Sequence, residues 1–303
     1  MKMKKIFSLF LVCALISPLA ALLNKNDAGT TAGQFLKLGM GGKAAALGDA
    51  VVAGVNDSTS IVWNPAGLTG VKGNQLSLMH SLYAADVFYD YLTFAKELPG
   101  IGTVAIGVQY VNYGSIIEMD NLGTELAGFT PYDLAINVGY ALNLNGLSAG
   151  VNVKYISSVI KHTATALAAD VGAQYTVSGV KLGAAVYNLG TGMKFVNDTV
   201  GLPVYLRLGA AYSPMANLIV EADGEFPADG AIGFGIGAEY LYSLGAEMSL
   251  APRAGYNSIN EVSGFKGFTF GVGFNWTTYT LDYALVPFGD MGLVHKISIG
   301  MKF

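Results

Sequence analysis

Charge, basic clusters and long apolar runs are all scarce in this sequence. Only 13% of its 303 residues are charged, whereas 52% are hydrophobic, and the mean hydropathy is +0.45. This composition is too apolar for an ordinary cytosolic enzyme. The net charge of -4 and the lack of a basic cluster in the mature chain argue against a nucleic-acid partner. Beyond the N-terminus, no apolar run reaches the roughly 18 residues that a membrane-spanning helix needs.

Cysteine is nearly absent as well, since the single cysteine is Cys13. Residues 1–22 are predicted to be a secretory signal peptide, because lysines at the start precede an apolar run that is too short to cross a bilayer. Cleavage is expected between Ala20 and Leu23. The alternative that Cys13 is lipidated is disfavoured, because Val12 is not the small residue that such processing prefers. The mature chain would then lack a thiol for a disulfide or a cysteine metal site.

Glycine and tyrosine are plentiful, with 40 and 17 residues, and from residue 74 onward apolar residues alternate with small or polar ones. The alternating segments are roughly nine to thirteen residues long, about the length that a tilted strand needs to cross a membrane. The charged residues in the clearest segments all lie on the less apolar face. They include Asp133, Lys154, Asp170, Arg207, Glu239 and Asp282, together with Lys296 and Lys302 of the last segment. A charge that faces lipid at mid-membrane costs about 2 to 4 kcal/mol, so these residues are predicted to line the lumen of a transmembrane β-barrel.

A water-soluble β-sandwich would also alternate, but two features favour a membrane barrel. Tyrosines close many segments on the apolar face, as an aromatic girdle would, and short connections alternate with longer ones. We therefore expect an all-β fold, an antiparallel transmembrane barrel of about 14 strands over residues 74–303. Residues 216–225 and residues 251–256, which contain Pro252, give the weakest strand patterns.

The chain ends directly on an alternating segment whose last residue is Phe303. This segment looks like the terminal strand of outer-membrane barrels, whose closing aromatic residue is the signal that the barrel-assembly machinery recognises. Phe303 is therefore predicted to be the assembly signal, and its strand is predicted to pair with the first strand to close the barrel. A buried C-terminal strand of a soluble fold is the alternative, but it would leave an apolar edge without a cover.

Residues 23–73 differ from the barrel segments in their sequence pattern, because small residues cluster there and do not alternate with apolar ones. Asn56, Asp57 and Ser58 are suited to cap a short helix, and Asn64 followed by Pro65 fits a second helix start. Since about fourteen strands would enclose a wide lumen, these residues are predicted to fold inside the barrel as a hatch.

Glycines on the predicted inner face would leave room for such a hatch, although they could equally relieve strand coiling. These glycines are Gly183, Gly209, Gly233, Gly235, Gly237, Gly271 and Gly273.

Several stretches resemble the PorV/PorQ family, a branch of the FadL-like outer-membrane proteins. They read FLKLGMGGKAAALGDA, NDSTSIVWNPAGL, PRAGY and VPFGDMGLVHKISIGMKF. The element formed by Asn64, Pro65 and Ala66 is shared with the fatty-acid transporters of the wider superfamily and is taken as a hatch motif. The resemblance implies a bacterial outer-membrane barrel of fourteen strands with an N-terminal hatch. It departs from the secretion-type members at Lys43, which is followed by residues 44–47 in place of a Gly-Met-Gly run.

Catalytic and metal-binding signals are weak. The three histidines, His80, His162 and His295, have no metal-ligand spacing with one another. The sequence has neither a nucleophile elbow nor a phosphate-binding loop, and Ser298 and His295 fall on opposite strand faces. We expect no enzymatic activity and no cofactor.

Two functions stay open. In the first, the barrel passes or binds a hydrophobic small molecule through its plugged lumen, with Phe195, Val196, Phe288 and Met291 of the outer loops meeting the ligand. In the second, which the family resemblance also implies, it is a non-enzymatic shuttle or attachment component of type IX protein secretion and binds a secreted protein. Its other expected partners are outer-membrane lipid and the barrel-assembly machinery.

Overall fold

The computed structural model describes residues 29–83, 86–260, 267–287 and 292–303. The predicted signal peptide and Cys13 lie outside these residues. The helices are η2 (Gln34–Lys37), α2 (Gly42–Ala46), α3 (Ser60–Trp63), η3 (Pro65–Gly70) and η4 (Ser258–Asn260). Among the described residues, none of the helices is long and apolar enough to cross a membrane.

The strands are β1 (Asn74–Leu82), β2 (Phe88–Leu98), β3 (Gly102–Asn112), β4 (Tyr132–Leu144), β5 (Leu147–Val159), β6 (Thr163–Val177), β7 (Val180–Gly190), β8 (Met193–Phe195), β9 (Asp198–Val200), β10 (Tyr205–Met215), β11 (Leu218–Pro227), β12 (Gly233–Tyr240), β13 (Tyr242–Ser243), β14 (Met248–Asn257), β15 (Phe268–Trp276), β16 (Tyr279–Pro287) and β17 (Leu293–Lys302). Apart from the separate hairpin β8–β9, the strands form one antiparallel sheet in chain order, in which β7 pairs with β10 and both β12 and β13 pair with β14.

The barrel closes where β1 pairs with β17, with Gln75 opposite Lys302 and Leu82 opposite His295. Because β12 and β13 share one register on β14, they form a single interrupted strand, and the closed barrel has fourteen strands. The predicted all-β fold, the strand number and the closing role of the last strand are confirmed.

The interruption between β12 and β13 has a cause in the facing strand. Glu239 pairs with Arg253 and Tyr242 pairs with Leu250, so the same register sets Pro252 against the break. Proline has no backbone N–H, so it cannot donate to the ladder. The strand pattern of residues 251–256 was weak for this reason, yet β14 still runs through Pro252 and pairs it with Val272 of β15.

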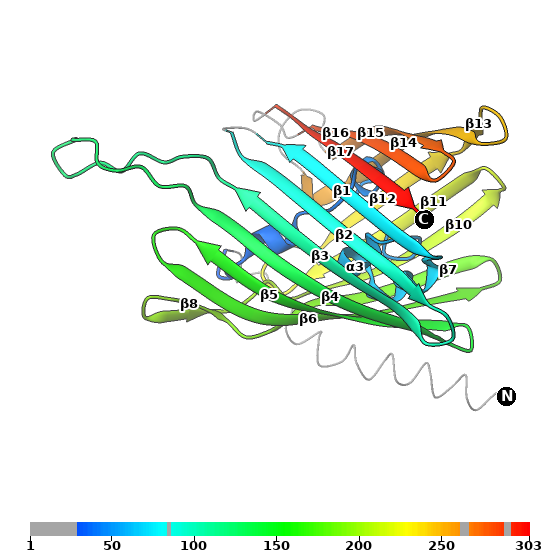
Figure 1. Ribbon diagram of the computed structural model, residues 1–303, viewed down its shortest axis with the longest axis horizontal. Coiled ribbons are helices and arrows are strands. Elements are labelled where there is room, and N and C mark those ends of the chain that lie inside the picture. The colour runs from blue at the N-terminus through cyan, green and yellow to red at the C-terminus, as the bar shows by residue number, and fades with distance from the viewer. Residues whose placement is uncertain (1–28, 84–85, 261–266, 288–291) are drawn as a thin grey trace.

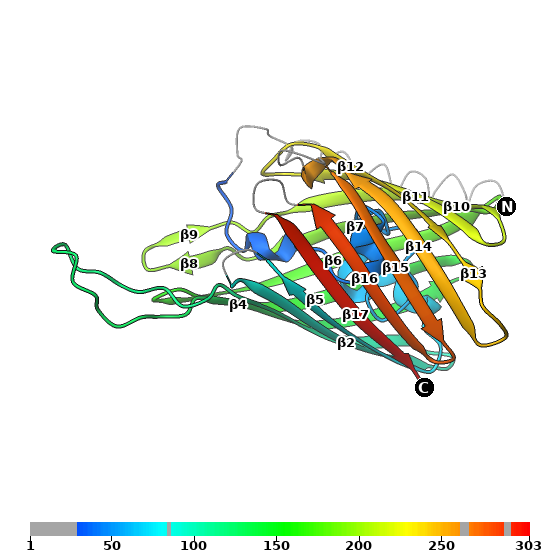
Figure 2. The same ribbon diagram turned by 90° about the horizontal axis from the view of Figure 1, so that it is seen from above.

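The two ends of the barrel differ in their connections. We call the end with the short turns and Phe303 the inner end, and the opposite end the outer end. The turns at residues 145–146, 178–179, 216–217 and 277–278 are two residues long. At the outer end, residues 113–131 form an arm that projects far beyond the strands, and hairpin β8–β9 extends from the same end (Figures 1 and 2). This is the predicted alternation of short and long connections.

The helix that residues 56–58 were predicted to cap begins slightly later. α3 starts at Ser60, and Asp57 Oδ1 accepts a hydrogen bond of 2.9 Å from the Thr59 N–H, one residue before the helix. Asn64 and Pro65 behave as predicted, since the Asn64 side chain accepts from the Ala66 N–H and Pro65 opens η3.

Candidate functional site: the filled lumen

Residues 29–73, here called the N-terminal segment, run through the barrel from the outer end to the inner end (Figures 1 and 2). At the outer end, the Ala32 N–H donates to the Gly201 carbonyl at 2.8 Å, in the connection between β7 and β10. At the inner end, the Glu97 N–H donates to the Gly73 carbonyl at 2.8 Å. In between, α2 packs against β14 to β17 and η3 packs against β3 to β6. The segment therefore touches opposite walls of the lumen.

Lumen-facing glycines let the segment approach the wall at backbone distance. An added Cβ would collide with residues 46–53 at Gly183, Gly209, Gly235, Gly237 and Gly271. At Gly233 the Cβ would meet Ile259, and at Gly273 it would meet the Arg253 guanidinium. The interpretation that glycines make room for the N-terminal segment therefore holds for five of the seven predicted positions, and the other two accommodate wall residues.

Asn64 links the N-terminal segment to β6 and also links two parts of the segment to each other. Its side chain is fully buried, and its Nδ2 donates to the Val52 carbonyl at 2.8 Å and to the Ala173 carbonyl at 3.1 Å. Its Oδ1 accepts from the Ala66 N–H at 3.1 Å. One amide side chain thus joins two turns of the segment to the wall. This explains why the first residue of the Asn-Pro-Ala element is asparagine.

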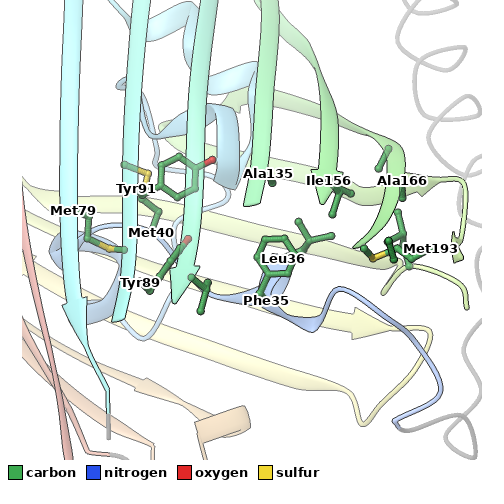
Figure 3. Close-up of a cluster of buried hydrophobic side chains, with 14 residues drawn as sticks. Phe35, Leu36, Met40, Met79, Tyr89, Tyr91, Ala135, Ile156, Ala166 and Met193 are labelled. Carbon is green, nitrogen blue, oxygen red and sulfur yellow. The ribbon is translucent and has the colours of Figure 1, made fainter. Parts of the chain in front are cut away.

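The outer half of the lumen holds a large apolar cluster, here called the outer apolar cluster (Figure 3). The wall contributes Met79, Tyr89, Tyr91, Val111, Ala135, Ile156, Ala164, Ala166, Ala168, Met193 and Leu202. The N-terminal segment contributes Phe35, Leu36 and Met40, which are 3%, 5% and 1% exposed. The chain therefore fills this apolar space with side chains of its own, two of them from the four-residue helix η2.

Few polar contacts hold η2 in that place. Gln109 Nε2 donates to the Phe35 carbonyl at 3.0 Å, and the Tyr89 hydroxyl donates to the Leu38 carbonyl at 3.2 Å. Asp229, in the connection between β11 and β12, accepts from Lys37 Nζ at 2.5 Å and from Gln34 Nε2 at 2.7 Å.

Asp229 also accepts a hydrogen bond from the Thr31 hydroxyl. Burial alone would raise the pKa of Asp229, but the hydrogen bonds from Lys37, Thr31 and Gln34 outweigh it and lower the pKa below its ordinary value. Asp229 is therefore the point where an outer connection holds the start of the segment.

The inner half of the lumen holds buried ion pairs beside smaller apolar clusters. Arg253 Nε lies 2.5 Å from Glu239 Oε2, and Arg253 Nη1 lies 2.6 Å from Asp282 Oδ1. Lys43 of α2 adds a longer contact, 3.4 Å, to Glu239. This network links the N-terminal segment to β12, β14 and β16.

Two further ion pairs lie on the other wall. Lys154 Nζ lies 2.7 Å from Asp170 Oδ1, and Arg207 forms a pair with Glu225 while its guanidinium stands 5.0 Å from the Trp63 ring. Beside them, Glu221 and Asp223 of β11 each keep one buried carboxylate oxygen without a hydrogen-bond partner among the described residues.

A polar cavity of about 150 Å³ lies at the inner end, between the segment and strands β1, β12 and β14 to β17. Lys43, Asp57, Arg253 and Asp282 are among its lining residues. A second, smaller cavity of about 60 Å³ shares Lys43, Asp57 and Asp282 with it and reaches Met40 of the outer apolar cluster. The segment therefore packs tightly on the glycine-lined wall and less tightly near the closing strands.

The structure places the six predicted lumen residues that precede the last segment at buried or nearly buried positions. Asp133, Lys154, Asp170, Arg207 and Glu239 are less than 9% exposed, and the Asp282 side chain is 15% exposed. Lys154 and Asp170 contact each other directly, whereas Glu239 and Asp282 meet only through Arg253. Asp133 stands apart from them and accepts a hydrogen bond of 2.5 Å from the Tyr113 hydroxyl.

Sequence reasoning missed Arg253, Glu225, Glu221 and Asp223, and it predicted only the face of Lys296. Arg253 and Glu225 lie in the two segments with the weakest strand patterns, so their phase was not assigned. Lys296 Nζ donates to the Gly39 carbonyl at 2.8 Å, a contact that its inner-face position in the last segment could have suggested.

The predicted loop positions are only partly described. Phe195 packs against the outer apolar cluster and Val196 is 67% exposed at the tip of hairpin β8–β9. Phe288 and Met291 lie outside the described residues. His80 and His295 point to the outer surface of the barrel and His162 lies in an exposed turn. Among the described residues, no group of three His, Cys, Asp or Glu side chains could hold a metal ion.

Residues 22–221 match the family described as Type IX secretion system protein PorV. The chain belongs to this PorV family. The family resemblance of the sequence is thereby confirmed. None of the curated proteins compared with the chain matches it.

Solved structures share the barrel fold of this PorV family member. The toluene transporter TodX of Pseudomonas putida aligns with a TM-score of 0.62 at 12% identity, over 88% of this chain and 98% of its own. The toluene transporter TbuX of Ralstonia pickettii gives 0.59 at 14% identity, over 88% and 98%. A Pseudomonas aeruginosa FadL homologue gives 0.52 at 11% identity, over 86% and 98%. The PorV match and the closed barrel locate the chain in the bacterial outer membrane, as predicted.

Proposed function

We propose that this barrel binds a hydrophobic small molecule in the outer half of its lumen and passes it inward beneath a hatch formed by residues 23–73. The observation that carries the proposal is the outer apolar cluster, in which Phe35 and Leu36 take up space between apolar wall residues. A buried apolar site with a few convergent polar groups is the usual form of a small-molecule site. The shared fold with barrels titled as toluene transporters supports this class of ligand.

The ligand would replace η2. When Phe35 and Leu36 leave, the apolar walls become available, and so do Gln109 Nε2 and the Tyr89 hydroxyl, which now donate to the Phe35 and Leu38 carbonyls. Both groups would then donate to an acceptor on the ligand. The expected ligand is therefore an amphiphile with a long apolar part and one acceptor group, such as a carboxylate.

Titration with a fluorescent long-chain carboxylate tests this proposal. Purified protein should bind the probe saturably. Phe35→Ala should bind it more tightly, because the ligand then displaces a smaller side chain. Leu122→Ala, at a position 91% exposed on the outer arm, is the matched control and should bind like the parent. Absence of saturable binding by both the parent and Phe35→Ala would reject the proposal.

The remaining sequence-based assignments are part of the same proposal. Residues 1–22 would be removed as a signal peptide, and Phe303 would direct the chain to the barrel-assembly machinery. Removal of Phe303 should lower the amount of heat-modifiable barrel in cells. The chain would carry out no catalysis and need no cofactor, and its lumen would be lined by Asp133, Lys154, Asp170, Arg207, Glu239 and Asp282.

A second function, as a component of type IX protein secretion, is favoured by the family description and by the outer arm. The arm, residues 113–131, is held as a hairpin by bridges between Ile116 and Phe129 and between Met119 and Glu125. Its exposed apolar side chains include Ile117, Met119, Leu122 and Leu126. Such a patch on an arm that projects from the membrane suits a protein partner.

Affinity capture from native outer membranes separates the two functions. If the arm holds a secretion partner, Leu122→Asp should lose that partner and keep amphiphile binding, whereas Phe35→Ala should keep the partner. If neither variant changes what is captured, the arm has no such role.

A further inference from the structure

The outer surface of the barrel carries a polar pair that departs from the charge sorting seen in the other strands. His80 of β1 and Asp90 of β2 are directly opposite each other, and His80 Nδ1 lies 2.6 Å from Asp90 Oδ1. His80 is on the same face of β1 as the exposed Leu78, and Asp90 is on the same face of β2 as the exposed Leu92. The buried Met79 and Tyr91 are on the opposite face. The pair therefore faces lipid and not the lumen.

Neither side chain is buried by the pairing. The His80 side chain is 52% exposed and that of Asp90 is 43% exposed. Since the carboxylate can only accept, His80 Nδ1–H donates to it, and His80 Nε2 and the second Asp90 oxygen are left to face the surroundings. A polar pair on a lipid-facing wall costs free energy, more so toward the membrane centre, and this cost calls for a compensating partner.

The position of the pair in the strands corresponds to the outer leaflet. His80 comes two residues before the outer end of β1, and Asp90 comes two residues after the outer start of β2. Aromatic rings lie at the same height, since the Phe88 ring is 6.1 Å from the His80 ring and 6.1 Å from the Tyr110 ring. Aromatic rings of this kind mark the membrane interface, where lipid headgroups lie.

A hollow of about 510 Å³ adjoins the pair on the same outer surface. It spans β17, β1, β2 and β3, across the closing seam of the barrel. Apart from His80 and Asp90 its lining is apolar or aromatic, namely Leu78, Met79, Tyr91, Leu92, Val108, Tyr110, Ile297 and Ile299. Ile299, Leu78 and Leu92 lie farther from the outer ends of their strands than the polar pair. The hollow thus runs from a polar outer end toward the membrane centre.

We propose that this hollow is a binding site for one outer-leaflet lipid whose head carries a hydrogen-bond donor, an ammonium or a hydroxyl. A lipid of the outer leaflet has its head outward and its chains toward the membrane centre. The hollow matches this orientation, because its outer end is polar and the rest of its lining is apolar or aromatic. The Asp90 carboxylate accepts from the head, and a charge-assisted hydrogen bond of this kind is stronger than a neutral one. An acyl chain lies along Leu78, Leu92 and Ile299. The hollow and the outer apolar cluster share Met79 and Tyr91 of the wall but lie on opposite sides of it. Because the lipid stays outside the barrel, the site does not rest on the proposed function.

Native mass spectrometry of the full chain in detergent tests the site. The probes are phosphatidylethanolamine and phosphatidylcholine with the same acyl chains, which differ in whether the ammonium has N–H donors. The parent should retain one phosphatidylethanolamine and at least tenfold less phosphatidylcholine. The double variant His80→Leu and Asp90→Leu should lose at least tenfold of the retained phosphatidylethanolamine.

His295→Leu is the matched control, because His295 is also lipid-facing at the outer end of its strand but does not line the hollow and instead bonds to the Tyr283 hydroxyl at 2.7 Å. It should retain the lipid like the parent. Heat-modifiable gel mobility checks folding, and the double variant should keep it, since leucine suits a lipid-facing position.

Three outcomes would overturn the proposal. Equal retention of the two lipids would reject the role of the head donor. Equal retention by the parent and the double variant would reject the site. A protein that copurifies with the parent in place of lipid, and is lost in the double variant, would show that the hollow holds a protein surface.

Discussion

The outer and inner halves of the lumen are filled by the same stretch of chain in two different ways. In the outer half, η2 inserts Phe35 and Leu36 into apolar surroundings and is held by hydrogen bonds with a few residues of the wall and of an outer connection. In the inner half, α2 and the residues after it lie at backbone distance from glycines and beside buried ion pairs. In the proposed function, the outer contacts are exchanged for those of an apolar ligand. The inner contacts cannot be exchanged in this way, because they depend on one backbone position and on paired charges.

The comparison predicts that damage to the inner half costs more than damage to the outer half. Arg253→Met should have the largest effect, since it leaves Glu239 and Asp282 without their buried cation. Breaking a buried ion pair from one side typically costs about 3–5 kcal/mol. The unfolding midpoint of the barrel in urea, measured in detergent or lipid vesicles, should fall accordingly.

Lys72→Met is the control for charge loss alone, because the Lys72 side chain is 76% exposed in its 3.0 Å pair with Glu97. Its effect should stay below about 1 kcal/mol. Equal effects of the two variants would show that the Arg253 network is not what stabilises the inner half.

Gly237→Ala should have the next largest effect. The added methyl would collide with the Leu47 backbone, and overpacking of this kind costs about 1–3 kcal/mol. Gly107→Ala is the matched control, since Gly107 also faces the lumen but its Cβ would meet only side-chain atoms of Tyr91 and Thr93, at 3.3 and 3.4 Å. Thermal unfolding followed by heat-modifiable mobility should separate the two; the same loss in both would refute a special fit between segment and wall.

Asp229→Asn should have the smallest effect on global unfolding and the clearest effect on the outer half. The substitution weakens the contacts to Lys37, Gln34 and Thr31, at a cost of roughly 1 kcal/mol. Hydrogen exchange of residues 31–38 should speed up while exchange in β12 to β15 stays the same. If both regions change together, the two halves are not independent.

Acid should act on the parent protein in the same direction. Because the folded-state pKa of Asp229 lies below its ordinary value, its stabilising contribution is complete above the unfolded-state pKa of about 4. It is lost as the pH falls through the folded-state pKa. Exchange of residues 31–38 should therefore accelerate below about pH 4 in the parent and change less in Asp229→Asn.

The sequence predicted the barrel well because strand phase is local. Alternation at period two shows which face Lys154 or Asp170 occupies without any knowledge of neighbouring strands. The pairing of charges is not local, because it depends on the register between strands and on segments that interrupt the alternation. Arg253 was overlooked beside Pro252 for this reason. Asp90 is the reverse case, since its phase puts it on the lipid face, where the expected sorting of charges would not have placed it.

The path of the N-terminal segment constrains the order of assembly. Its residues lie against β5 to β7 on one side and β14 to β17 on the other, and they lead directly into β1, the strand to which β17 must join. A cylinder sealed beforehand would have to admit a folded helix past glycines that leave no clearance. We therefore expect the sheet to close around the segment, with the pairing of β1 and β17 formed last.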